Sequence, residues 1–164
     1  GNLDQVAKVH ELCGDALNIW SGNDDQIVDI LERGGKGVIS VLSNVCPQET
    51  HDIVAKYLDG DVDGSKALMD HYFELAKTLF CDVNPIPVKD AVNRIGYAAG
   101  PCRMPLVPLS EANQQKMQAT LEKAQEVQSY DENYYYRRQR QNGSCDPQRC
   151  SRSGGLHGSS RCGF

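Results

Sequence analysis

Two short apolar runs limit the fold of this chain more than any other feature. LNIWSG (17–22) ends at a glycine, and GVISVLSN (37–44) is rich in β-branched residues and follows a glycine-rich turn. Such runs are typical of strands that are buried on both faces of a parallel sheet. The helical pattern of DDQIVDILERGG (24–35) between them completes a strand–helix–strand unit. Since two strands cannot close a parallel sheet, the pattern predicts an α/β fold in which they are only a part.

The rest of the chain up to residue 127 has the periodicity of helices. Apolar residues recur at helical spacing in 4–13, 48–58, 64–80, 88–97 and 110–126. Pro85 and Pro87 are placed to start the helix over 88–97. We therefore predict an α/β part over 1–58 and a helical region over 59–127.

Charge and composition change sharply after residue 127. Residues 1–127 contain 11 Lys and Arg against 19 Asp and Glu, whereas 128–164 contain six Arg and three acidic residues. The tail is polar, rich in Gly, Ser and Arg, and has no periodic apolar face, so we predict that 128–164 is disordered. No run is long enough to cross a membrane, and the amino-terminal residues do not resemble a signal peptide, which favours a cytoplasmic protein without membrane contacts.

Three local patterns have a structural interpretation that we prefer to a functional one. DGDVDGSKALMD (59–70) opens like a calcium-binding loop, but Lys66 and Asp70 stand where an apolar residue and a glutamate are required. We interpret it as a solvated turn between helices. GGKG (34–37) precedes a strand instead of following one, so it is predicted to be a tight turn and not a phosphate loop. The scattered cysteines of the acidic part, Cys13, Cys46, Cys81 and Cys102, are expected to be reduced thiols.

Four motifs in order along the chain resemble one family. SGND (21–24), GGKGVISVLSN (34–44), NPIPVK (84–89) and RMPLVPLS (103–110) together resemble dihydrodipicolinate synthase, and the resemblance extends from Gly1 to Ala124. It implies the last two strands of a (β/α)8 barrel, followed by a helical carboxyl-terminal region. It also implies homotetramers in the full-length family, whose members condense pyruvate with aspartate semialdehyde through a Schiff base on a lysine. No cofactor or metal is implied.

The resemblance also assigns candidate site residues. Gly22 and Ile39 match positions whose backbone lines the pyruvate site, Asn44 follows the last strand, and Asn84 matches a position near the barrel mouth. The Schiff-base lysine of the family would lie four residues before Gly1, and none of the eight lysines of this chain occupies its position. We therefore expect no catalytic residue within the chain and no activity of the isolated chain.

Two other functions stay open at this point. One is a related pyruvate aldolase similar to N-acetylneuraminate lyase. The other is a helical module without enzymatic activity, in which DENYYYRRQR (131–140) binds nucleic acid through aromatic and cationic side chains. We favour the synthase, and with it an absence of nucleic-acid partners.

A third interpretation of the tail is a reading frame that continues past its usual end. Shifted by one nucleotide, 131–147 permits MKIIITGANGKMGRAI, which resembles the start of dihydrodipicolinate reductase.

Overall fold

The chain begins with an amphipathic helix that matches its predicted extent. The computed structural model describes residues 1–124, so every prediction for the tail over 128–164 lies outside the described residues. In α1 (Leu3–Cys13), the Asn2 side chain accepts a hydrogen bond from the Gln5 backbone N–H at 3.1 Å and caps the first turn. Gly14, with a φ of +51°, ends the helix and donates its N–H to the His10 carbonyl.

The two predicted strands form and pair in parallel, but each is much shorter than expected. Strand β1 is Trp20–Ser21 and β2 is Gly37–Val38, with Trp20 opposite Gly37 and Ser21 opposite Val38. The prediction of strands over 17–22 and 37–44 was therefore wrong in length. Within residues 1–124 each strand has only the other as a partner, and a ladder of two strands has little to extend it.

The expectation that both strand faces are buried was also wrong. Ser21 is buried and Val38 packs against the core, so this face of the sheet is covered. On the opposite face the side chains of Trp20 and Ile39 are 52% and 71% exposed. In the described residues, helix α2 (Ile27–Glu32) contacts both strands, which leaves one face of the sheet open.

The segment between the strands is a short helix with a turn at each end. A 3-10 turn over Asp24–Gln26 leads into α2, which is shorter than the predicted 24–35. After α2, the Gly35 N–H donates to the Ile30 carbonyl at 2.8 Å, and Gly34 adopts a φ of +85°. The GGKG sequence is thus confirmed as the tight turn that joins a helix to a strand.

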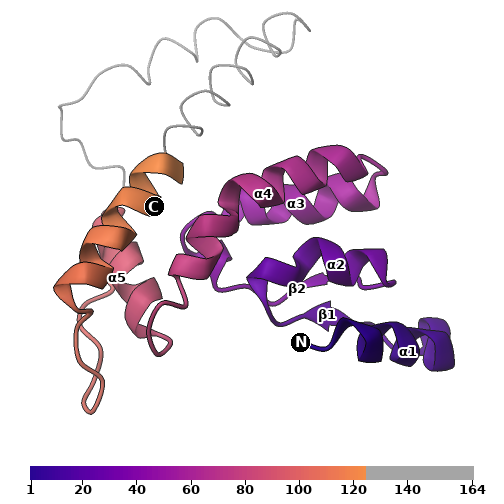
Figure 1. Cartoon of the computed structure of the whole chain (residues 1–164), viewed down its shortest axis with the longest axis horizontal. Coiled ribbons are helices and arrows are strands. Elements are labelled where there is room, and N and C mark those ends of the chain that lie inside the picture. Colours follow the sequence, from indigo (N-terminus) through magenta and orange to yellow (C-terminus); the bar gives the residue numbers. More distant parts are fainter. Residues whose placement is uncertain (125–164) are drawn as a thin grey trace, which may run out of the picture. The chain divides into compact units, whose positions relative to one another are not determined.

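Two long helices follow and pack against each other (Figure 1). They are α3 (Pro47–Leu58) and α4 (Val62–Thr78), and the buried Ser65 hydroxyl of α4 donates to the Ile53 carbonyl of α3 at 2.6 Å. The Asp61 carboxylate accepts the Gly64 N–H at 3.0 Å and so caps α4. The calcium-loop pattern is therefore a turn between helices, as the sequence indicated.

The last described helices are α5 (Ile86–Arg94) and a helix over 111–124 (Figure 1). Their buried apolar residues Ala91, Met117 and Leu121 belong to one core with residues of α2, α3 and α4. Because this core contains residues on both sides of position 58, it links the two predicted parts. The boundary between 1–58 and 59–127 stays a prediction.

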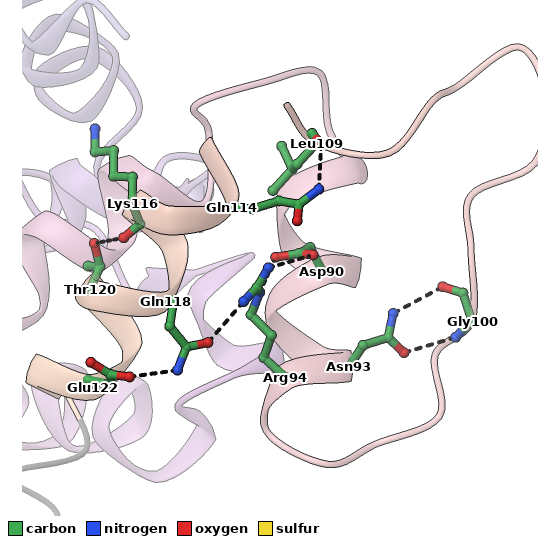
Figure 2. A network of polar contacts seen from close by, with 10 residues as sticks. All are labelled: Asp90, Asn93, Arg94, Gly100, Leu109, Gln114, Lys116, Gln118, Thr120 and Glu122. Carbon is green, nitrogen blue, oxygen red and sulfur yellow. Dashed lines mark hydrogen bonds and ion pairs between the residues drawn. The ribbon is translucent and has the colours of Figure 1, made fainter. Parts of the chain in front are cut away.

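A network of polar contacts joins α5 to its neighbours (Figure 2). Arg94 pairs with Asp90 in the same helix and donates to Gln118 in the helix over 111–124 at 2.9 Å. Asn93 exchanges two hydrogen bonds with the Gly100 backbone, at 3.2 and 3.1 Å, and so fixes the loop that connects the two helices.

The cysteines of this part of the chain are free thiols, as expected. Cys46 is buried at the start of α3, whereas Cys13, Cys81 and Cys102 are half-buried. Burial raises the pKa of Cys46 to about 12, so its thiol stays protonated at neutral pH. It therefore behaves as a packed apolar group and not as a nucleophile.

Candidate functional site

The candidate site lies at the carboxyl ends of β1 and β2, where the chain leaves each strand. The Ile39 N–H donates to the Ser21 carbonyl at 2.8 Å, which keeps the two strand ends adjacent one residue beyond the ladder. The Ser21 hydroxyl donates to the Asn23 carbonyl at 2.8 Å and accepts the Asn23 N–H at 3.2 Å. These bonds give the loop after β1 a fixed shape. In parallel α/β folds this edge is where ligands bind.

Asp24 ties the two loops of this edge together. Its side chain is 1% exposed, and its Oδ2 accepts the N–H groups of Val41 at 3.0 Å and Leu42 at 2.9 Å. The carboxylate thus binds the start of the 3-10 helix Leu42–Asn44, which follows β2. Its Oδ1 is also buried, without a hydrogen-bond partner among the described residues.

Asn23 and Asp24 stand just before the first turn of the next helix, where capping residues are common. Asn23 and Gln26 nevertheless make no side-chain cap bond, and Asp24 binds the other loop instead. A signal of this role was present in the sequence. Asp24 lies three positions before the buried Ile27, and a carboxylate that is drawn into a core requires hydrogen-bond donors.

The structure brings two of the four predicted site residues together. Gly22 follows β1 and Ile39 follows β2, so they continue the strand register on the same face of the sheet. A Cβ atom at Gly22 would meet no atom within 4 Å, and the Ile39 side chain is 71% exposed. The backbone at Gly22 is therefore open to a ligand.

The two predicted asparagines lie on neighbouring elements. Asn44 is exposed at the end of its 3-10 helix and donates its Nδ2 to the Val41 carbonyl at 3.0 Å. Asn84 is also exposed, two residues before α5, and α5 packs against Leu42–Asn44. The described contacts include no bond between Asn84 and the other three predicted residues.

A hollow of about 290 Å³ adjoins the loop after β1. It is lined by that loop, by the end of α4 and by a residue just after α4; the lining residues are Asn23, Asp24, Asp25, Ala76, Lys77 and Phe80. Asp24 therefore both binds the loop after β2 and lines this hollow. Over residues 1–124 no three His, Cys, Asp or Glu side chains are arranged to hold a metal ion.

Most lysines of the chain contact a polar or aromatic group. Seven of the eight have a carboxylate, carbonyl or aromatic ring as partner: Lys8, Lys36, Lys56, Lys66, Lys77, Lys89 and Lys123. For Lys66, the hydrogen bond with Glu32 at 2.7 Å raises the pKa of the amine. A Schiff-base lysine needs the opposite shift, because only the neutral amine attacks a carbonyl. The Lys66 amine is therefore not prepared for covalent catalysis.

Comparison with known proteins gives one consistent result. The model of the Dihydrodipicolinate synthetase family matches residues 1–124. The 4-hydroxy-tetrahydrodipicolinate synthase of Clostridium perfringens is 53% identical over 113 residues, which are 69% of this chain and 39% of that protein. The chain thus spans about two fifths of the length of this relative.

Solved structures agree with the sequence match. The 4-hydroxy-tetrahydrodipicolinate synthase of Methylacidiphilum fumariolicum superposes with a TM-score of 0.77 at 32% identity, over 81% of this chain and 44% of that one. A dihydrodipicolinate synthase from Acinetobacter baumannii, complexed with pyruvate, gives a TM-score of 0.70 at 27% identity, over 75% of this chain and 42% of that one. In residues 1–124 no helix combines the length and the apolar character needed to cross a membrane.

Proposed function

Because the chain belongs to the dihydrodipicolinate synthetase family, we propose that it is part of a 4-hydroxy-tetrahydrodipicolinate synthase and carries the last two strands of its barrel. The observation that carries this proposal is the match of residues 1–124 to the family, with β1 and β2 parallel and helices on one face. The open face of the sheet then belongs to the barrel interior. Helix α3 then completes the barrel part, and α4, α5 and the helix over 111–124 are the helical region after the barrel. The substrates, pyruvate and aspartate semialdehyde, are cytoplasmic metabolites, and the complete enzyme is a homotetramer.

The reaction needs an amine that this chain does not supply. A lysine amine attacks the C2 carbonyl of pyruvate, water leaves, and the resulting imine loses a C3 proton to give an enamine. The enamine C3 then attacks the aldehyde carbon of aspartate semialdehyde. This lysine lies in the part of the family that residues 1–164 do not cover. The hydrogen bond of Lys66 to Glu32, which favours the charged amine, agrees with that assignment.

Within this chain, the strand edge binds and shapes the pyruvate site. Gly22 leaves its backbone accessible, and Ile39 contributes backbone and an exposed side chain beside it. Asn44 and Asn84 line the mouth of the site, the first held by its bond to the Val41 carbonyl. Asp24 is a positioning residue, since it holds the loop after β1 to the loop after β2 without facing the open strand face.

An assay of two proteins tests the proposal. The first is the 164-residue chain alone, and the second is the same chain joined behind the part of the Clostridium perfringens relative that precedes the match. We expect the joined protein to condense pyruvate with aspartate semialdehyde and to trap a pyruvate adduct with borohydride. The chain alone should do neither.

Two results would contradict the proposal. One is turnover, or an adduct on any of Lys8 to Lys123, in the chain alone. The other is a joined protein that folds, as judged by circular dichroism, but forms no pyruvate adduct. Mass spectrometry of the digested adduct identifies the modified lysine in each case.

A further inference from the structure

The open face of the sheet carries an aromatic residue that lies directly over a glycine. Trp20 and Gly37 are partners in the β1–β2 register. A Cβ atom at Gly37 would lie 2.6 Å from Cζ3 and 2.9 Å from Cε3 of the Trp20 ring, closer than two carbon atoms can approach. The indole thus fills the space of the missing side chain at position 37. The glycine fixes where the ring lies, because any larger residue would displace it.

Strand alternation places this indole below the candidate pyruvate site. Trp20 and Gly22 are two residues apart on one strand, and Gly37 and Ile39 are two apart on the other. Side chains two residues apart lie on the same face, separated by roughly 6–7 Å along the strand. The Trp20 ring is therefore one layer deeper in the sheet than Gly22 and Ile39, on the side away from the carboxyl edge.

The space above the ring is free in this part of the chain. Nothing lies within 4 Å of a Cβ at Gly22, and the side chains of Ile39 and Trp20 are 71% and 52% exposed. On one face of the sheet, the three residues thus present an open backbone position, an aliphatic side chain and an aromatic ring. A rigid indole is a poor partner for a carboxylate and cannot shrink to admit additional atoms.

We propose that Trp20 determines specificity by forming the floor of the pyruvate site and limiting it to a three-carbon 2-oxo acid. This inference rests on the proposed function, which puts pyruvate against Gly22 and Ile39. A 2-oxo acid with one more methylene needs room that the ring occupies. Exclusion of one methylene by a packed pocket typically changes kcat/KM by about 10- to 200-fold.

The test compares two 2-oxo acids in the joined protein described above. For the unmodified sequence, kcat/KM is measured with pyruvate and with 2-oxobutyrate, each with aspartate semialdehyde. In Trp20→Ala, where the floor is lowered, we expect the ratio of 2-oxobutyrate to pyruvate to rise by about tenfold or more. In Trp20→Phe, which keeps an aromatic ring over Gly37, the ratio should rise much less.

A second readout keeps the inference distinct from the proposed function. Borohydride trapping with an equal mixture of the two acids gives the adduct ratio without the aldehyde step, and it should move in the same direction. If the unmodified joined protein traps no pyruvate, the proposed function fails. If it traps pyruvate, but Trp20→Ala and Trp20→Leu both fold and keep the original selectivity, the inference about Trp20 is overturned. Trp20→Leu covers the case in which the alanine variant does not fold.

Discussion

At the scale of single residues, one buried carboxylate determines how the two strand ends meet. Asp24 is almost fully buried and accepts two backbone N–H groups of the neighbouring loop, at 3.0 and 2.9 Å. Hydrogen bonds to a carboxylate are stronger than bonds to a neutral acceptor, and the bond from the Leu42 N–H is buried. The positions of Gly22 and Ile39 therefore depend on a residue that contributes no surface to their face of the sheet.

Replacing Asp24 by Asn should lower the free energy of unfolding by about 1–3 kcal/mol, since the amide keeps one acceptor but loses the charge. Asp24→Ala should cost more, because the N–H groups of Val41 and Leu42 then have no acceptor. Urea unfolding followed by circular dichroism measures both. The control is Asp25→Asn, an exposed neighbour, which should change stability by less than about 0.5 kcal/mol. Equal effects at both positions would refute this role of Asp24.

At the scale of elements, the two long helices α3 and α4 were predictable, whereas the lengths of the strands and of α2 were not. The ends of α3 and α4 fall within two residues of prediction, because proline, Asp61 and the apolar periodicity are local signals. The 37–44 run has the composition of one long strand, yet its second half turns into the 3-10 helix Leu42–Asn44. That turn depends on Asp24, eighteen positions before Leu42, and no local pattern records it.

The helix over 111–124 is held to the rest of the chain by apolar packing and by polar contacts, and the two contributions can be compared. Leu121 is 4% exposed in the core, whereas Arg94 and Gln118 bond across a partly solvated surface (Figure 2). Leu121→Ala should therefore destabilise the chain by about 2–5 kcal/mol, because it leaves a cavity. Arg94→Met keeps most of the aliphatic stem and should cost no more than about 1 kcal/mol.

Urea unfolding of the two variants, with hydrogen exchange of residues 111–124, checks this order. If hydrogen exchange in Leu121→Ala becomes faster only in residues 111–124, this would agree with apolar packing of that helix against the core. If Arg94→Met proves as damaging as Leu121→Ala, the polar network and not the core fixes the helix.

At the scale of the whole molecule, the sequence identified the family but not the state of the open sheet face. The motifs over 21–24, 34–44 and 84–89 predicted the match to 1–124, since they contain glycine and proline positions that a backbone geometry requires. They carry no information about which surfaces find a partner. Trp20 and Ile39 are exposed in residues 1–124, and under the proposed function the other strands of the barrel would cover them.

Within residues 1–124, an exposed apolar face lies beside two strand edges that have no partner, and such a surface should make the isolated chain associate with itself. We expect sedimentation velocity to show concentration-dependent association, and Ile39→Lys to weaken it by about tenfold or more, since burial of one large aliphatic side chain contributes about 1.5–3 kcal/mol. Met104→Lys is the matched control, because Met104 is 85% exposed in the loop before the last helix, away from the sheet. It should leave association unchanged. Joining the chain to the preceding part of the Clostridium perfringens relative should abolish this association mode, because the added strands cover Ile39. Association that survives both Ile39→Lys and the joining would mean that another surface is responsible.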